Sequence, residues 1–424
     1  SESRAVARIL TASGQSFCSG SLLNNTSRDF RAYLLTAFHC ADCYPRDGTI
    51  DPTEEYWAEH WAFRFNYKMT HCEGEQVASY FTYNNDDIIA AWYTTDFILV
   101  ELNDSPLAYP LVSFLGWDRR NNVPTEGTTI HHPRGDVMKL SFDEDQLQSD
   151  SYMGGPPNTH WKAEFEIGTI ETASSGAPLF DQNERVVGQL SGYDNWNPNY
   201  PFCDQRNRYG QFGKFDVSWT GGGTPTTRLR DWLDPCETGA YTMNTLPGAY
   251  ITGPDIICTS LNNPFILNNV PPGKTVTWFA NPYLVTPSSG NGSFATVNAT
   301  CNDIGYTEIT FTISDGCGST QIEKEFLAAG PDYSEVELYV TYSTGQQAPK
   351  SGGIYLLCPY TYYYFYVINN SDCSTSGYQW TLPPSISKVY QYNNMICVYT
   401  SCLLYTSDAA DELDGVDLGG RRII

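Results

Sequence analysis

Three short segments of the sequence carry residue types that together could activate a hydroxyl group for attack on a carbonyl. The run YLLTAFHC ends with His39 followed by a cysteine, and TTDFILVEL has Asp96 at the head of an apolar run. ASSGAPLF surrounds Ser175 with small residues before another apolar run. A serine hydroxyl is a poor nucleophile until a neighbouring base takes its proton. We therefore predict that Ser175 is the nucleophile, that His39 is the base, and that Asp96 holds the histidine tautomer and stabilises the imidazolium.

Each of these segments also has a structural interpretation. A single histidine before a cysteine is more often structural, an aspartate heading a strand is usually a turn or cap residue, and SSG is usually a loop. Their order, His39, Asp96, Ser175 with wide spacings, is that of chymotrypsin-type β-barrels and favours the catalytic interpretation. The small residues around Ser175 let the backbone turn tightly, so we predict an oxyanion hole made by the N–H groups of Ala173 and Ser175.

Composition limits the compartment and the partners. The chain has 424 residues, 48 of them acidic and 24 basic, which gives a formal charge of −24. This charge argues against nucleic acid and anionic membrane surfaces as partners, because both select clustered Lys and Arg. Thirteen Cys against six His favour disulfides and an oxidising compartment over metal. No apolar run is long enough for a membrane-spanning helix, so we expect a secreted protein without a membrane span.

The elements that must position the three residues belong to the first of several domains. At roughly 100–200 residues per domain, the length predicts two to four. Residues 1–236 form one domain, which ends in RLRDWLD (228–234), a short helix stopped by Pro235. A linker covers 237–248. The following segment has short β-branched and aromatic runs separated by turn residues, which predicts one β-sandwich at 249–330 and a second, incomplete one at 331–401.

The last 23 residues are excluded from the fold prediction. Within residues 402–424, CLLYTSDAADE and VDLGGRRII resemble the two translated halves of a transposon-type sequencing adapter; the alternative is a natural acidic tail. Removing these five acidic and two basic residues changes the formal charge from −24 to −21 and leaves twelve cysteines. The chain begins at Ser1 without Met, so we expect an export signal and an N-terminal stretch to be missing, together with a C-terminal continuation.

The first domain resembles a known family. Residues 1–236 are similar to the trypsin-like serine peptidases of bacterial secretion, the lysyl endopeptidase group in particular. The resemblance runs through CSGSLLNN, YLLTAFHC, DFILVELN, GWDRR, HHPRGD, SSGAPLF, VVGQLSG and SWTGGG with RLRDWLDP. It implies an all-β, chymotrypsin-like fold of two six-stranded antiparallel β-barrels with the site between them, and the same catalytic triad. It also implies that Leu190, Ser191 and Gly192 pair with the substrate backbone, and that a disulfide joins Cys18 to Cys40.

Two departures from the family pattern bear on the site. The family usually has Gly two residues before the nucleophile, where this chain has Ala173, and a Cβ is tolerated there only if the backbone dihedrals suit an L-residue. Lysyl endopeptidases also carry an Asp at the base of the S1 pocket, where YGQFGKF here places Gly210; Asp204 could compensate only through a loop shift. Without a buried carboxylate, a desolvated Lys ammonium is not stabilised. We predict loss or weakening of Lys specificity in favour of hydrophobic or small P1 residues.

The remaining cysteines and histidines leave alternatives open. Cys72 and Cys203 stand where the family bridges to upstream cysteines, and Cys43 could instead pair with Cys72. The six later cysteines at 258, 301, 317, 358, 373 and 397 allow several connectivities. Zinc is the rival interpretation, but these cysteines lie far apart without His, and we predict no metal and no cofactor. We expect His131 and His132 to pack in the second barrel or to line a loop.

The leading functional hypothesis is a secreted serine endopeptidase acting on protein or peptide substrates. Its later domains resemble the Ig-like (PKD-like) modules of exported Bacteroidetes proteins, which would space or anchor the enzyme. The alternative is a catalytically degenerate, protease-like adhesion or binding protein. A third hypothesis, compatible with the first, is polysaccharide or cell-surface contact through residues 249–401. The many tyrosines between 360 and 392 could form a carbohydrate-binding face, although core and sheet packing explain them better.

Overall fold

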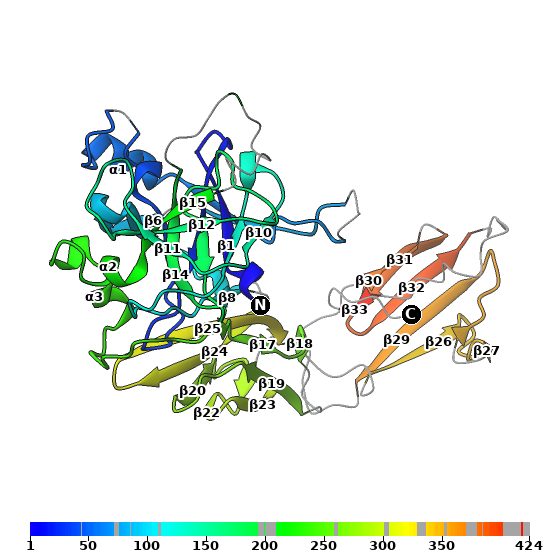
Figure 1. Cartoon of the computed structure of the whole chain (residues 1–424). Coiled ribbons are helices and arrows are strands. Elements are labelled where there is room, and N and C mark those ends of the chain that lie inside the picture. Colours follow the sequence, from blue (N-terminus) through cyan, green and yellow to red (C-terminus); the bar gives the residue numbers. More distant parts are fainter. Residues whose placement is uncertain are drawn as a thin grey trace. The chain divides into compact units, whose positions relative to one another are not determined.

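The computed structural model describes most of the 424 residues. The described part excludes residues 44, 72–75, 85, 109–111, 194–198, 200–208, 258–261, 301–304, 329–335, 352–353, 370–379, 384, 402–416 and 419–424. It divides into two compact units, and Figure 1 labels their helices and strands. The first comprises Ser1–Ile251 with Leu267–Val276 and Phe311–Ile322, and the second comprises Thr252–Ile266, Thr277–Thr310 and Glu323–Ile424. The domain boundaries predicted from the sequence stay predictions, because the two units interleave.

The first sheet of the first unit is a closed antiparallel barrel. Its strands lie in the order β5-β4-β1-β2-β3-β7-β6. They are β1 (Val6–Leu10), β2 (Ser16–Leu22), β3 (Tyr33–Ala37), β4 (Ala62–Phe65), β5 (Phe81–Asn84), β6 (Asp86–Trp92) and β7 (Phe97–Leu102). A single residue separates β5 from β6, and these two strands lie at opposite ends of the order, with β5 beside β4 and β6 beside β7. Counted as one bent strand, they close the sheet into a barrel of the six strands that the resemblance implied.

The second sheet has a comparable strand order. Its order is β10-β9-β13-β14-β15-β12-β11, and its two end strands follow each other in the sequence. The strands are β9 (Gly127–His131), β10 (Lys139–Asp143), β11 (Gln148–Asp150), β12 (His160–Glu164), β13 (Pro178–Phe180), β14 (Val186–Gly192) and β15 (Tyr209–Lys214). Alternate residues of these strands fill the interior. The buried cluster comprises Leu147, Trp161, Ala163, Phe165, Ile170, Ala177, Leu179, Val187, Leu190 and Phe212.

Short helices and one small sheet complete the first unit. The helices are α1 (Pro52–Ala58), α2 (Phe215–Thr220) and α3 (Arg230–Leu233), with 3-10 turns η1 (Glu2–Arg4), η2 (Phe38–Cys40), η3 (Tyr93–Thr95), η4 (Pro106–Ala108), η5 (Pro133–Gly135) and η7 (Pro225–Thr227). Helix α1 begins at a capping box, in which the Asp51 side chain accepts from the Glu54 N–H and the Glu54 carboxylate accepts from the Asp51 N–H. Helix α3 lies within the segment expected to be helical and ends before Pro235. Strand β8 (Ser113–Phe114) pairs with β16 (Leu246–Pro247).

The C-terminal half of the chain is also β-structure. One sheet has the order β17-β19-β23-β21 and a second has the order β18-β25-β24-β20-β22. The strands are β17 (Tyr250–Thr252), β18 (Ile256–Ile257), β19 (Asn263–Asn268), β20 (Thr275–Ala280), β21 (Val285–Thr286), β22 (Ser289–Asn291), β23 (Phe294–Ala299), β24 (Gly305–Asp315) and β25 (Gly318–Ala328). Phe265 of one sheet packs on Phe326 of the other, with ring centroids 4.9 Å apart. These two rings belong to the second compact unit and join the inner faces of the two sheets.

A third C-terminal sheet has the order β26-β29-β32-β31. Its strands are β26 (Val336–Tyr342), β29 (Tyr362–Asn369), β31 (Ile386–Tyr392) and β32 (Met395–Thr400), beside the short pairs β27 (Lys350–Ser351) with β28 (Ile354–Tyr355) and β30 (Trp380–Thr381) with β33 (Asp417–Leu418). Val340, Tyr363, Phe365, Ile396 and Val398 form its buried cluster. Apart from β33, the segment 402–424 that the sequence analysis set aside lies outside the described residues.

Two disulfides occur among the described residues. One joins Cys18 to Cys40, as the resemblance implied, and the other joins Cys236 to Cys317 across 81 positions within the first unit. No partner was predicted for either Cys236 or Cys317. Cys43, Cys358 and Cys397 are free thiols. The cysteines at 72, 203, 258, 301 and 373 lie outside the described residues. In the described part of the chain, no helix is long and apolar enough to cross a membrane.

Candidate active site

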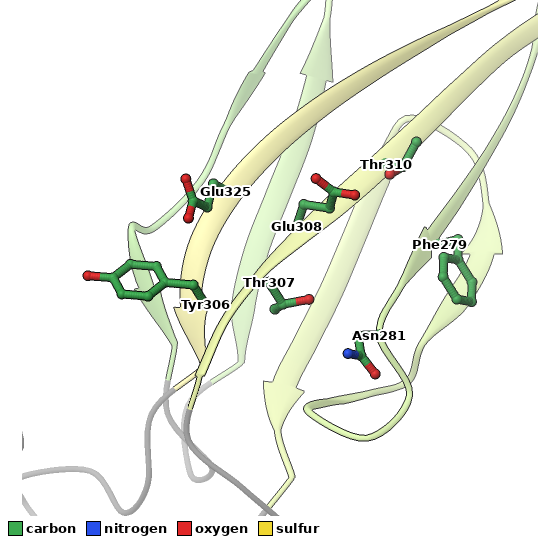
Figure 2. A pocket seen from close by; sticks show the side chains of 7 residues that line it. All are labelled: Phe279, Asn281, Tyr306, Thr307, Glu308, Thr310 and Glu325. Carbon is green, nitrogen blue, oxygen red and sulfur yellow. The ribbon is translucent and has the colours of Figure 1, made fainter.

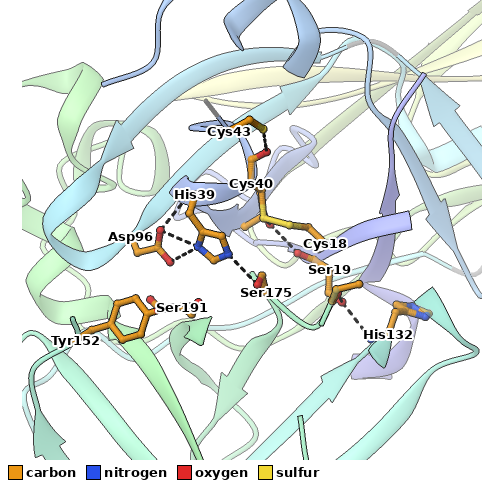
Figure 3. The surroundings of a disulfide bond; sticks show 12 residues. Cys18, Ser19, His39, Cys40, Cys43, Asp96, His132, Tyr152, Ser175 and Ser191 are labelled. Atoms are coloured by element: carbon orange, nitrogen blue, oxygen red, sulfur yellow. Dashed lines mark hydrogen bonds and ion pairs between the residues drawn. A yellow bond between two sulfur atoms is a disulfide. The ribbon is translucent and has the colours of Figure 1, made fainter. Parts of the chain in front are cut away.

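The first barrel positions His39 at the end of a buried strand. All five residues of β3 are buried, and the chain then turns through η2, which contains His39. The disulfide from Cys18 on β2 holds the residue that follows His39 (Figure 3). The imidazole itself is 24% exposed, so it is both anchored and reachable.

Asp96 lies at the turn between β6 and β7, in direct contact with His39. It ends η3 with φ 55° and ψ 37°, a left-handed conformation that Asp tolerates better than most residues. Its Oδ2 and Oδ1 atoms lie 2.9 and 3.1 Å from His39 Nδ1, and Oδ1 also accepts from the His39 N–H at 2.9 Å. The Asp96 carbonyl accepts from the Phe38 N–H at 2.8 Å. These contacts fix the orientation of the ring and leave Nε2 facing away from the carboxylate.

Ser175 comes from the second barrel and meets His39 from the other side. Its Oγ atom is 2.8 Å from His39 Nε2 (Figure 3). The Ser175 carbonyl accepts from the Ser19 N–H at 2.8 Å, and the Gly176 N–H donates to the Leu190 carbonyl at 2.7 Å. Gly176 has φ 82°, and an added Cβ would collide with Thr36 Oγ1 and the Ser19 carbonyl. The small residue after the nucleophile is therefore required by the close approach of β2 and β3.

The backbone around Ser175 aims two N–H groups in defined directions. The Thr172 carbonyl accepts from the Arg134 N–H at 2.6 Å, and the Ser174 carbonyl accepts from the Ala177 N–H at 3.0 Å. Both following peptide bonds are trans, so the N–H groups of Ala173 and Ser175 point away from these partners. Among the described residues, neither N–H donates a hydrogen bond. Two free, fixed donors beside Ser175 Oγ are what a developing oxyanion needs.

Ala173 adopts a backbone conformation that suits glycine better. Its φ is 70°, in the left-handed region, and the residue is 3% exposed. A Cβ in this region costs roughly 1–2 kcal/mol. The backbone dihedrals at this position therefore suit an L-residue only with strain. The surrounding hydrogen bonds hold the residue in this conformation.

The predicted substrate-binding strand lies at the end of β14. Leu190 and Ser191 are buried, and Gly192 ends the strand with φ 151°. Ser191 Oγ is 3.2 Å from His160 Nε2, and the Tyr152 hydroxyl donates to the Ser191 carbonyl at 3.4 Å. Neither His160 nor Tyr152 was predicted to belong to the site. Neither residue stands in a recognisable motif, and only the pairing of β11, β12 and β15 brings them here.

Gly210 lies in an apolar environment on β15. A Cβ added there would meet Phe212 Cε2 at 3.0 Å and the Cδ1 atoms of Ile170 and Leu190 at 3.1 Å. Asp204, the carboxylate considered as a substitute, lies outside the described residues. The three atoms nearest to a Cβ added at Gly210 are therefore methyl and aromatic carbons.

Two antiparallel barrels, with His39 and Asp96 from one meeting Ser175 from the other, are the arrangement of the chymotrypsin-like serine proteases. Residues 1–200 match the protein-family model described as lysyl endopeptidase, C-terminal domain. Lysyl endopeptidase of Pseudomonas aeruginosa is 28% identical over 217 residues, which cover 48% of this chain and 44% of that protein. The chain therefore spans less than half the length of this curated relative. Residues 1–200 are therefore similar to the lysyl endopeptidase family, and the two antiparallel sheets of the first unit have the fold of the chymotrypsin-like serine proteases.

The solved structures that match this chain include two proteases. The VesB protease of Vibrio cholerae is 13% identical with a TM-score of 0.34, over 78% of this chain and 96% of that chain. A Glu endopeptidase determined in complex with MPD is 15% identical with a TM-score of 0.33, over 50% of this chain and 86% of that chain.

Proposed function

We propose that the chain is a secreted serine endopeptidase that cleaves peptide bonds through Ser175, His39 and Asp96. The observation that carries this proposal is the 2.8 Å separation between His39 Nε2 and Ser175 Oγ, with Asp96 bound to the opposite ring nitrogen. A base at this distance is within proton-transfer reach of the hydroxyl.

The reaction follows from these contacts. His39 Nε2 takes the proton of Ser175 as Oγ bonds to the substrate carbonyl carbon, and Asp96 stabilises the imidazolium. The N–H groups of Ala173 and Ser175 bind the oxyanion of the tetrahedral intermediate. The imidazolium then gives its proton to the leaving amine nitrogen as the peptide bond breaks, which leaves Ser175 acylated. Water activated by His39 hydrolyses the ester by the same steps and regenerates the hydroxyl.

The test is covalent labelling with a fluorophosphonate probe, which reacts with an activated serine. The wild-type chain is expected to be labelled at Ser175, and Ser175→Ala is expected to remain unlabelled at the same concentration. A wild-type chain that folds but is neither labelled nor proteolytic would support the degenerate, protease-like binding protein instead.

We further propose that P1 specificity is not restricted to Lys. The apolar groups around Gly210 favour a hydrophobic or small P1 side chain. A Lys ammonium buried there would lose its hydration, and no carboxylate would compensate for that loss. Profiling with a peptide library randomised at P1 tests this proposal directly. A strong preference for Lys would overturn it while leaving the endopeptidase proposal intact.

For residues 249–401 we propose Ig-like modules that contact polysaccharide. Figure 2 shows a pocket on β20, β24 and β25 of the second unit, where Phe279 and Tyr306 accompany Glu308 and Glu325. The two rings are 56% and 74% exposed, and exposed rings beside carboxylates are suited to stacking on sugar rings and accepting from hydroxyl groups. Pull-down of residues 249–401 on insoluble polysaccharides tests this, and the Phe279→Ala and Tyr306→Ala variants should lose binding.

A further inference from the structure

A chain of buried hydrogen bonds runs behind the segment that carries the two proposed oxyanion donors. Ser174, the residue before the nucleophile, has its Oγ 2.8 Å from His131 Nδ1. The other ring nitrogen, His131 Nε2, lies 3.2 Å from Ser141 Oγ. His131 and Ser174 are 0% exposed and Ser141 is 1% exposed. The three side chains therefore have one another and nearby backbone groups, rather than bulk water, as partners.

Both ends of this chain return to the backbone of residues 169–174. The Ser141 hydroxyl donates to the Thr169 carbonyl at 2.9 Å, and Ser174 Oγ accepts from the Glu171 N–H at 3.2 Å. The Ser174 N–H also donates to the Glu171 carbonyl at 3.0 Å. His131 stands on β9 and Ser141 on the neighbouring β10, so two strands of the rigid barrel hold the loop that precedes Ser175.

The donors and acceptors of this chain fit only one arrangement of protons. Ser141 donates to Thr169, so its oxygen is the acceptor for the N–H on His131 Nε2. His131 Nδ1 is then unprotonated and accepts the hydroxyl proton of Ser174. Ser174 Oγ in turn accepts the Glu171 N–H. Each hydroxyl donates once, and the arrangement requires a neutral His131.

The environment of His131 keeps the ring neutral. Burial, followed by the nearby His132 and Lys139, lowers the pKa of His131 to about 3. At neutral pH the network therefore contains no charged group. An ion pair between Arg134 and Glu171 also reaches this loop, but the link from β9 to Ser174 itself consists of hydrogen bonds between neutral groups.

We infer that His131 is a positioning residue, which acts through Ser174 to hold the Ala173 and Ser175 N–H groups in the conformation that binds an oxyanion. This inference rests on the proposed endopeptidase function. The need for such support comes from Ala173, whose left-handed φ of 70° is unfavourable for a residue with a Cβ. Without the anchor at Ser174, the loop keeps only its backbone hydrogen bonds and the bond from the Ser19 hydroxyl to the Ala173 carbonyl, so the Ala173 and Ser175 N–H groups are held less tightly toward the oxyanion.

The test compares four single variants of the full chain. Ser174→Ala and His131→Ala each remove the bond to Ser174. His131→Asn retains an amide oxygen near the position of Nδ1 and can still accept the Ser174 hydroxyl. His132→Gln is the matched control, because His132 is also 0% exposed and its ring Nδ1–H donates to the Asp136 carbonyl rather than to the loop.

The measurements are kcat and KM on the best peptide from P1 profiling, together with the rate of fluorophosphonate labelling. Ser174→Ala and His131→Ala are expected to lower kcat and the labelling rate by roughly 10–100-fold, with KM changed less than about 3-fold, because only oxyanion binding is impaired. His131→Asn should recover at least about 3-fold in kcat over His131→Ala, and His132→Gln should keep the wild-type kcat.

The outcomes separate this inference from the function on which it rests. If wild type is labelled at Ser175 but Ser174→Ala and His131→Ala keep its kcat, the positioning role is wrong and the endopeptidase proposal stands. An equal loss of kcat in His132→Gln would also overturn it, because the effect would then be general core damage. If His131→Ala does not fold, Ser174→Ala decides alone, since it removes one small hydroxyl. If wild type itself is not labelled, the proposed function fails first.

Discussion

The hydroxyl of Ser19 donates a hydrogen bond to the carbonyl oxygen of Ala173 at 2.9 Å, and so links the first barrel to the nucleophile loop of the second. Ser19 is fully buried on β2, and its N–H also donates to the Ser175 carbonyl at 2.8 Å. One strand residue thus holds the carbonyl groups on both sides of Ser174. Because the Ala173 carbonyl is fixed here, its left-handed backbone conformation persists despite the Cβ.

Ala173→Gly is expected to keep this conformation and remove its strain. The free energy of unfolding should rise by up to about 1 kcal/mol, since the relief of the left-handed Cβ exceeds the extra flexibility of Gly in the unfolded chain. The value of kcat should stay the same or increase. Urea unfolding and steady-state kinetics check both. Glu184→Gly is the control, because exposed Glu184 has φ 59° in the turn between β13 and β14 and should show the stability gain without a kinetic change. A less stable Ala173→Gly protein would refute the account.

Asp96→Asn is expected to lower kcat by about 10³–10⁴-fold with little change in KM. The amide is nearly isosteric, but it cannot stabilise the imidazolium, and it presents an N–H where His39 Nδ1–H needs an acceptor. Steady-state kinetics at a fixed pH measure the loss. Asp231→Asn, which removes only the ion pair to Arg228 beside α3, should leave kcat unchanged. Retention of more than a tenth of wild-type kcat in Asp96→Asn would contradict the proposed role.

Gly210→Asp is expected to shift P1 preference toward Lys. A carboxylate among Phe212, Ile170 and Leu190 would supply the missing partner for an ammonium group, and without substrate it would destabilise the fold by roughly several kcal/mol. P1 profiling and thermal unfolding measure the two effects. Gly210→Ala controls for the tight contacts of the new Cβ and should show no gain for Lys. An unchanged P1 profile in Gly210→Asp would place the specificity pocket elsewhere.

Asp86→Asn is expected to remove a pH dependence of stability that arises outside the proposed triad. Asp86 is 1% exposed, and in the described structure neither carboxylate oxygen has a hydrogen-bond partner. Burial, then the charges of Asp87 and Glu59, raise the pKa of Asp86 from 3.8 to about 8. The folded state therefore binds this proton more tightly than the unfolded chain does. The resulting stability is complete below about pH 3.8 and is lost as pH rises through about 8.

The measurement is the free energy of unfolding of both proteins between pH 5 and pH 9. The difference, Asp86→Asn minus wild type, should grow by roughly 1 kcal/mol per pH unit across that window until it levels off near pH 8. Asp87→Asn, at an exposed neighbouring position, should show a much smaller slope. Parallel pH profiles for wild type and Asp86→Asn would show that Asp86 is ionised in the folded protein.

The local sequence was sufficient to select His39, Asp96 and Ser175. Each stands in a segment of eight or nine residues that contains small or apolar neighbours. The order of the three residues along the chain reduced the possible folds to chymotrypsin-type β-barrels. The short helix before Pro235 and the strand alternation after residue 249 were also local signals. The pairing partners of these strands could not be predicted locally, because alternation shows which face of a strand is buried but not which strand lies beside it.

Only the tertiary structure decided what holds the three residues in place. Ser19, His131, Ser141 and Ser174 are polar residues in or next to buried strands, and nothing in their immediate sequence distinguishes an anchor from an ordinary core residue. The sequence predicted that His131 would pack in the second barrel or line a loop, but it did not reveal the hydrogen bond between His131 and Ser174. The disulfide between Cys236 and Cys317 was equally hidden, since 81 positions separate the two cysteines. Chemistry is carried by residue types in short motifs, whereas positioning depends on contacts between distant segments, which exist only once the barrels have closed.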